Sequence, residues 1–314
     1  MTARSSSRHL AAFSFDIEDW YHSQLLPAGS GDHAASGVSV VRAGTERILE
    51  QLARHGVRST FFVLGEVIRD HPDLVRRMIA EGHEIGCHGM HHEPLWHTTR
   101  DGFREELRQF RAIAREHLGD VPITGFRAPT FSLDRRTAWA LEVLREEGFE
   151  YDSSIFPAKV KMYGVPEAPT GIYRPAADDL ARHDPNGGLV EFPVAVASWG
   201  TAFRLPVGGG FYLRALPFPV FRWALDHILR SRPFALYLHP RETHPETHRL
   251  PLDPVDGFIT YINLHTVVEK LERLYPRYTW VPMREILERE GHLTPRIAGD
   301  AKAAAATRGA AGGA

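Results

Sequence analysis

The feature that most constrains this chain is a regular alternation of short strand-like and longer helix-like segments between residues 11 and 290. The strand-like segments are 13–17, 59–65, 83–89, 123–129, 149–154, 189–197, 234–240 and 278–283. The helix-like segments are 42–56, 71–82, 100–117, 132–148, 215–231 and 261–274. Such alternation favours a parallel sheet, and seven or eight repeats predict an α/β fold, a single distorted (β/α)7-8 barrel.

No linker divides this repeating region, so residues 11–290 are predicted to form one domain. Residues 1–10 are predicted to be a flexible N-terminus. The segment 291–314, Ala/Gly-rich from about residue 295, is predicted to be disordered. The stretches 22–41 and 158–188 are rich in Gly, Pro and Asp and are predicted to be long loops, which often shape a site on such a scaffold.

Composition narrows the class of function. The net charge of the 314 residues is −2, which argues against a protein that binds nucleic acid or a membrane surface. The only cysteine is Cys87, so no internal disulfide can form, and a small buried packing role is expected for it. No apolar stretch is long enough for a transmembrane segment or a signal peptide, so the expected location is the cytoplasm.

Polar residues gather at the C-terminal ends of the predicted strands. In a (β/α) barrel these ends supply the functional groups. The residues concerned are Asp16, Glu18, His88, Arg127, Asp152 and His239. A solvated surface would scatter such groups over both ends of the strands, so their placement at one end predicts a functional site.

Three acids close the first strand, in the sequence AAFSFDIEDWYH (11–22). Side chains alternate faces along a strand, so Asp16 and Glu18 share one face, and Asp19 points elsewhere if the strand continues that far. Carboxylates packed this closely are costly when buried unless they bind a cation or a partner. The alternative interpretation is that Glu18 or Asp19 only caps a turn.

Two histidines in the sequence HGMHH offer neutral ligands for a metal. His88 and His92 are four residues apart, and a helical turn would place both on one face. Two imidazoles and one carboxylate form a zinc-type set that leaves a position open for water. The spacing alone is a weak signal, but it follows a strand, and other strand ends supply compatible groups.

Together these motifs resemble the NodB-type polysaccharide deacetylases of carbohydrate esterase family 4, and within them the exosortase-associated, exopolysaccharide-linked branch. The similarity covers residues 11–290 with the motifs in the family's order: FDIED, HGMHH, RAP, YDSS and LYLH. Two departures stand out. The usual adjacent Asp-Asp pair is spread over FDIED, and the Trp-containing end of the fourth motif is missing after Asp152.

The resemblance implies a role for each residue at these strand ends. A divalent metal would be held by Glu18, His88 and His92, with Asp19 as the alternative acidic ligand. Zinc is the default metal, although cobalt, nickel or manganese would fit similar ligands.

The other roles that the resemblance implies are catalytic. Asp16 would be the base and Arg127 its ion-pair partner. His239 would protonate the departing amine, and Asp152 would orient His239 or favour its protonated form.

The function implied by this resemblance is metal-dependent removal of N-acetyl groups from the sugars of an exopolysaccharide or its precursor. The partner would be an N-acetylated oligo- or polysaccharide, and the oligomeric state is not readable from the sequence. One alternative is an allantoinase-like amidohydrolase acting on a small cyclic amide. The other is a non-catalytic glycan-binding barrel, which would require the loss of at least one catalytic group.

Overall fold

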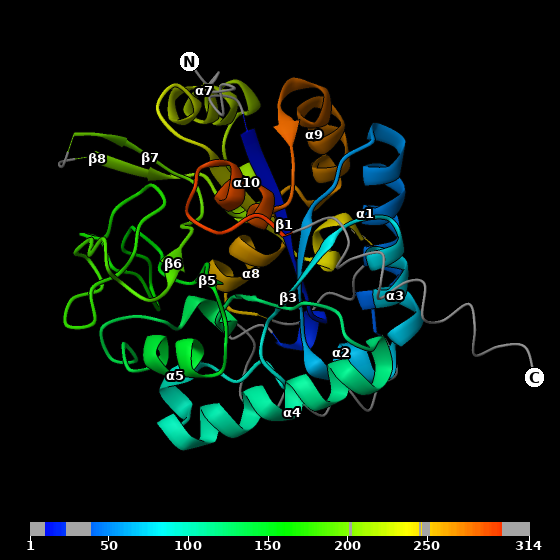
Figure 1. The fold of residues 1–314 in the computed structure, drawn as a ribbon. Coiled ribbons are helices and arrows are strands. Elements are labelled where there is room, and N and C mark those ends of the chain that lie inside the picture. Colours follow the sequence, from blue (N-terminus) through cyan, green and yellow to red (C-terminus); the bar gives the residue numbers. More distant parts are fainter. Residues whose placement is uncertain (1–9, 23–38, 201–202, 245, 247–251, 297–314) are drawn as a thin grey trace, which may run out of the picture.

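A computed structural model describes residues 10–22, 39–200, 203–244, 246 and 252–296 of the chain (Figure 1). Residues 1–9 of the predicted N-terminus and 297–314 of the predicted tail therefore lie outside the described residues. None of the helices within those ranges combines the length and the apolar content that a bilayer span requires.

The centre of the molecule is a parallel sheet of eight strands. The strands are β1 (Leu10–Ile17), β2 (Thr60–Val63), β3 (Glu84–Cys87), β4 (Gly125–Phe126), β5 (Tyr151–Asp152), β6 (Val190–Glu191), β9 (Phe234–Leu238) and β10 (Thr279–Trp280). Their order is β10-β1-β2-β3-β4-β5-β6, and β9 pairs with β1. Each of the eight predicted strand segments thus contains a strand, several of them shorter than expected.

The sheet curls until its two ends meet. A parallel bridge joins Val194, just after β6, to Ala235 in β9, and Ala195 N donates to Ala235 O over 2.8 Å. The strands from β4 to β6 are only two residues long, so few ladder positions join the strands on that side of the barrel. The predicted distorted barrel is confirmed. A separate antiparallel hairpin of β7 (Val196–Trp199) and β8 (Phe203–Pro206) projects beside it.

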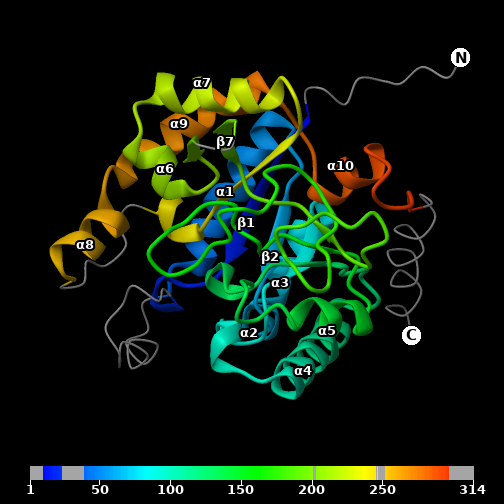
Figure 2. The same cartoon turned by 90° about the vertical axis from the view of Figure 1, so that its left-hand side faces the viewer.

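Helices surround the sheet, as Figures 1 and 2 show. They are α1 (Val41–His55), α2 (Gly65–Asp70), α3 (Pro72–Ala80), α4 (Arg100–Leu118), α5 (Ala140–Glu146), α6 (Gly210–Ala215), α7 (Phe218–Leu229), α8 (Pro254–Tyr261), α9 (Val267–Leu274) and α10 (Met283–Arg289).

The helix predicted at 132–148 begins only at Ala140. Before it, Thr137 Oγ1 accepts from Asp134 N and donates to Ser132 O. Side chain to backbone bonds of this kind compete with helix formation, so the segment before Ala140 forms turns instead.

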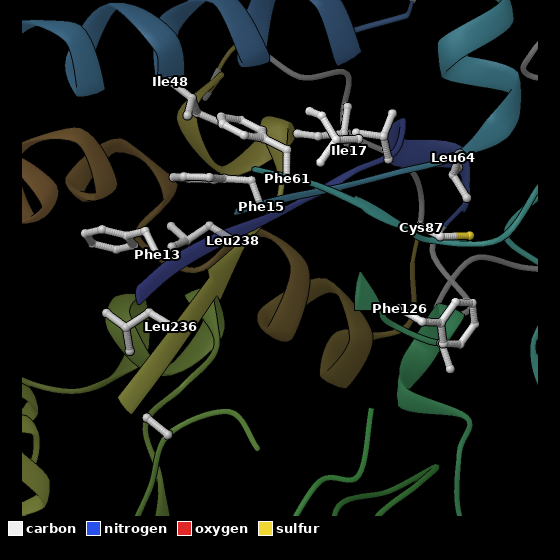
Figure 3. Close-up of a cluster of buried hydrophobic side chains, with 14 of the residues drawn as sticks. Phe13, Phe15, Ile17, Ile48, Phe61, Leu64, Cys87, Phe126, Leu236 and Leu238 are labelled. Carbon is white, nitrogen blue, oxygen red and sulfur yellow. The ribbon is translucent and has the colours of Figure 1, made fainter. Parts of the chain in front are cut away.

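The core lies between the outer face of the sheet and these helices. Phe13, Phe15 and Ile17 of β1 point outward into it, together with Phe61 and Cys87 from the next strands (Figure 3). Each large apolar side chain buried in this way contributes roughly 1.5–3 kcal/mol. The Cys87 thiol is enclosed by apolar atoms, and burial raises its pKa, as expected of a packing residue and not a nucleophile.

Candidate metal centre and active site

The alternation of β1 sends its polar residues to the inside of the barrel. Phe13, Phe15 and Ile17 occupy the outer core, so Ser14 and Asp16 face inward, and Asp16 is buried. The strand ends at Ile17, and Glu18 N donates to Asp16 O over 3.1 Å, which turns the chain at the mouth of the barrel. Asp16 and Glu18 therefore line the same cavity, as the alternation predicted.

Asp19 points away from that cavity. Its Oδ1 accepts hydrogen bonds from the backbone N–H of Trp20 and of Val40, the residue before α1. Asp19 is thus the acid that holds a turn, and Glu18 is the acid that faces the histidines. The alternatives left open by the sequence separate here because the two side chains leave the turn in different directions.

The loop after β3 brings His88 and His92 together, but not as a helical turn, so that expectation is wrong. Gly89 has φ 85° and His92 has φ 58°, and these left-handed residues fold the segment into a tight loop. Glu106 Oε1 accepts from Met90 N over 2.7 Å, and a Cβ on Gly89 would lie 2.9 Å from that oxygen. Any residue with a Cβ at position 89 would therefore disturb the loop.

Glu18, His88 and His92 form a buried three-residue cluster whose ligand atoms all lie within 4.8 Å of one another. Glu18 Oε2 is 2.5 Å from His92 Nε2 and 3.9 Å from His88 Nε2. Among the described residues, this buried oxygen has no hydrogen-bond partner. Since an orphaned carboxylate oxygen beside two imidazole nitrogens is costly, the donor set fits a divalent cation.

The surroundings of His88 also fit metal binding. Its Nδ1 donates to the backbone carbonyl of Arg127 over 2.8 Å, which leaves Nε2 directed at Glu18. Burial lowers the pKa of His88 to about 4, so the ring is neutral at physiological pH, as a metal ligand must be. Burial would raise the pKa of Glu18, but the contact with His92 and the charges of His92 and His239 outweigh burial and lower it far below its ordinary value.

Arg127 is fully buried and holds Asp16. One guanidinium nitrogen donates to Asp16 Oδ1 over 2.7 Å and to Ser14 Oγ over 2.8 Å. The other nitrogens donate to the carbonyl and hydroxyl oxygens of Ser153, and the group lies 4.3 Å from the Phe62 ring centroid. With its plane fixed by these contacts, Arg127 keeps the Asp16 carboxylate aimed into the cavity.

His239 follows β9 and is oriented by Glu242, a residue that the sequence analysis missed. Glu242 Oε2 lies 3.4 Å from His239 Nδ1, and Glu242 Oε1 accepts from Arg214 Nε over 3.0 Å. His239 Nε2 is left facing Glu18 Oε1, 3.5 Å away. Burial lowers the pKa of His239, but its contact with Glu242 and the charges of Glu18 and Glu242 raise it above the ordinary value.

A sequence signal for Glu242 did exist. His239 and Glu242 are the first and last positions of a capping box around the short 3-10 helix Pro240–Thr243. Gly210 at the start of α6 gives this carboxylate room, since a Cβ there would lie 2.1 Å from either oxygen.

Asp152 lies in β5 and does not line the cavity that His239 lines, so its position does not support the expectation that it orients His239. It is fully buried, accepts from the hydroxyl and the backbone N–H of Ser154, and pairs across the sheet with Glu191 of β6. Burial raises the pKa of both acids, and the neighbouring charge of Asp152 adds to the effect at Glu191, whose pKa rises well above its usual range. The pair supports the segment whose next residue, Ser153, holds Arg127.

The predicted residues other than Asp152 and Arg127 line one cavity of about 250 Å³ at the C-terminal ends of the strands. Its aromatic walls are Phe131, Tyr163, Phe211, Tyr212 and Tyr237. Residues 160–163 come from the predicted loop 158–188, which therefore shapes the site. Of the described non-glycine residues with positive φ, three of four (His92, Thr130 and Phe131) line this cavity, and strained backbone of this kind is concentrated at functional sites.

Known proteins resemble this chain in sequence and in fold. Residues 32–151 match the family model "Polysaccharide deacetylase", and residues 153–288 match a "Domain of unknown function (DUF3473)". Two solved structures share the fold. The "putative polysaccharide deacetylase" of Mycobacterium smegmatis has a TM-score of 0.60 at 23% identity, covering 94% of this chain and 96% of that one. PuuE allantoinase has a TM-score of 0.57 at 16% identity, covering 92% of each chain.

The fold defines the class, an α/β barrel shared with these two structures. A chitooligosaccharide deacetylase from Rhizobium leguminosarum bv. trifolii is 46% identical over 100 residues, which are 32% of this chain and 43% of that protein. Residues 32–151 of the chain thus match the polysaccharide deacetylase family. The match spans less than half the length of that curated relative.

The candidate site crosses the boundary between the two matched regions. His88, His92 and Arg127 lie in the polysaccharide deacetylase match, whereas His239 and Glu242 lie in the domain of unknown function. Asp16 and Glu18 precede both. The region of unknown function therefore supplies two of these seven residues.

Proposed function

We propose that this protein is a metal-dependent hydrolase that removes N-acetyl groups from N-acetylated sugars. The observation that carries the proposal is the buried cluster of Glu18, His88 and His92, whose orphaned carboxylate oxygen lies in one cavity with Asp16 and His239. When bound at these three residues, a divalent cation would polarise the acetyl carbonyl and lower the pKa of water.

Asp16 is the general base in this proposal. Its carboxylate lines the cavity and is not part of the ligand cluster. The contact with Arg127 fixes the position of the Asp16 carboxylate, which takes the proton of the attacking water. Ser14 and Ser153 fix the guanidinium, so the base cannot swing away from the reacting centre.

His239 is the general acid. Glu242 binds Nδ1 and its charge favours the imidazolium, so Nε2–H points into the cavity as a proton donor. The nitrogen of an amide leaves poorly as an anion, so protonation by His239 allows the C–N bond to break and the amine to depart. Arg214 holds the other oxygen of Glu242 and thus the orientation of the pair.

The finer assignments are proposals as well. Zinc suits two histidines and a carboxylate, and an exopolysaccharide or its precursor suits the resemblance of the motifs. The likeness to an allantoinase concerns the fold alone and does not favour a cyclic amide. A non-catalytic glycan-binding barrel would lack a catalytic group, and the base, the acid and the ligand set all stand around one cavity here.

The test combines elemental analysis of the purified protein with acetate release from N-acetylglucosamine oligomers, before and after treatment with a chelator. We expect one divalent ion per chain, acetate release that stops on chelation, and recovery when zinc is returned. Asp16→Asn is the matched variant, because it should keep the metal and lose turnover. Acetate release that persists in the chelated protein, or in Asp16→Asn, would contradict the proposal.

A further inference from the structure

One cation in the candidate active-site cavity has no ion-pair or hydrogen-bond partner among the described residues, although its charge acts on the nearby Glu242. Arg241 lies two residues after His239, is half-buried, and lines the same cavity as Glu18 and His92. Its guanidinium makes no ion pair or hydrogen bond with any other residue in the described part of the chain. An unpaired guanidinium beside aromatic walls is a ready binding group for an anion.

The neighbouring carboxylates already have partners, which explains why Arg241 forms no ion pair among the described residues. Both oxygens of Glu242 are engaged, Oε1 by Arg214 and Oε2 by the backbone N–H and ring of His239. Asp16 is bound to Arg127, and Glu18 belongs to the ligand cluster. Every carboxylate that lines the cavity thus has its own role, and none is left for Arg241.

The second flexible cation at the cavity is different. Lys161 also lines it, but its Nζ lies 3.3 Å from Asp256 Oδ1 at the start of α8. The pairs Asp16–Arg127, Glu242–Arg214 and Asp256–Lys161 are each neutral as a pair. A divalent cation on Glu18 would add one net positive charge, the His239 imidazolium adds a second, and Arg241 adds a third. The loaded cavity is therefore electropositive at the side where Arg241 stands.

From this charge balance we propose that the substrate is an anionic saccharide, whose N-acetylated sugar carries or adjoins a carboxylate or phosphate that Arg241 binds. This inference rests on the proposed deacetylase function and adds its substrate class. A guanidinium presents paired N–H donors that match either oxyanion in a bidentate manner. The aromatic walls, among them Tyr212 and Phe211, would hold the sugar rings while Arg241 selects the charge.

The experiment compares three substrates with the zinc-loaded protein. They are fully N-acetylated chitotetraose, which is neutral and is called chitotetraose below, a tetrasaccharide that alternates N-acetylglucosamine with glucuronic acid, and N-acetylglucosamine 1-phosphate. We expect kcat/KM for one of the anionic substrates to exceed that for chitotetraose about tenfold or more. Preference for the tetrasaccharide identifies a carboxylate, and preference for the phosphate ester identifies a phosphate.

The variants assign the preference to Arg241. Arg241→Gln should reduce the ratio of anionic to neutral kcat/KM about tenfold, mainly through KM, while Arg241→Lys should keep most of it. Arg222→Gln is the matched control, because Arg222 of α7 also lacks an ion pair among the described residues but does not line this cavity. It should leave the ratio unchanged.

Binding provides a readout that does not depend on turnover. Calorimetry in an Asp16→Asn background should show weaker binding of the preferred anionic substrate when Arg241→Gln is added. Equal binding with and without that change, or a ratio that Arg241→Gln does not alter, would overturn the inference even if chitotetraose is deacetylated. Anion binding that depends on Arg241 without acetate release from any substrate would support the inference and contradict the proposed chemistry.

Discussion

Two buried glutamates in this barrel behave in opposite ways. Glu18 follows β1 and faces two imidazoles, and contact with His92 and the charge of His239 lower its pKa despite burial. Glu191 lies in β6 and faces Asp152, so burial and a like charge raise its pKa well above the usual range. The charged form of the same side chain is therefore favoured in one cluster and disfavoured in the other.

The comparison shows that the neighbours of a buried acid decide its role. The Glu18 cluster opens into a cavity, whereas Asp152 and Glu191 are fully enclosed and lie outside its lining. The first cluster has the properties of a site. The second supports structure, because it holds the segment from which Ser153 grips Arg127.

The strongest test of this difference removes one charge from each cluster. Glu18→Gln should lower the affinity for the metal by more than the roughly tenfold to hundredfold that changes in outer contacts cause. The metal content of the purified protein should therefore fall, and acetate release should fall to background. Glu191→Gln should keep a full metal complement. Elemental analysis of both variants checks this, and metal bound normally by Glu18→Gln would remove the distinction between the two clusters.

The next effect concerns the base. Asp16→Asn keeps the shape of the side chain but cannot take a proton, so we expect kcat to fall about 10²–10⁴-fold. The metal content should not change, because Asp16 lies outside the ligand cluster. Steady-state acetate release with parallel elemental analysis measures both quantities. A loss of metal in this variant would instead make Asp16 a ligand.

A smaller effect is expected from Glu242→Gln. The charge of Glu242 helps to raise the pKa of His239, and the acid form of His239 is the one required, so activity should fall as pH rises through that pKa. Without the charge the pKa drops, and the alkaline limb of the rate profile should move to lower pH, with kcat about tenfold lower at neutral pH. The pH dependence of acetate release measures this. An alkaline limb that stays in place would assign it to another group.

The smallest effect is on stability. The folded-state pKa of Glu191 is raised, so its contribution to stability is present at low pH and is lost as pH rises through that value. Glu191→Gln cannot ionise, so it should be more stable than the natural protein at about pH 8, by roughly 1 kcal/mol, and no more stable at about pH 5. Thermal unfolding at both pH values measures this, with Glu105→Gln on the exposed face of α4 as the control. A stability difference independent of pH would mean that the pair is not protonated in the fold.

Much of the site was predictable from local rules. Alternation along one strand is a property of the backbone itself, so it separated Asp16 from the core-facing Phe15 and Ile17 correctly. The strand–helix repeat placed the polar strand ends at one mouth of the barrel, and five of the six predicted strand-end residues contribute to or support a single cavity there. Their catalytic and ligand roles stay predictions.

Two of the wrong expectations about the site concern a contact between segments distant in sequence and the conformation of a loop. The partner of His239 was expected in Asp152, but sheet register places Asp152 opposite Glu191, and Glu242 approaches because Gly210 leaves room. The loop of His88 and His92 is not helical, since Gly89 and His92 adopt positive φ under the hold of Glu106.

The sequence by itself determined the parallel α/β architecture and the set of acids and histidines that reach one end of the sheet. The reason is that hydrophobic period and strand alternation are encoded over a few neighbouring residues. Only the tertiary structure decided which acid has a lowered pKa, which acid has a raised one, and which arginine in the cavity has no ion pair among the described residues. The pKa shifts depend on the burial and charge of neighbours that lie 39 residues apart in the sequence for Asp152 and Glu191 and 221 apart for Glu18 and His239.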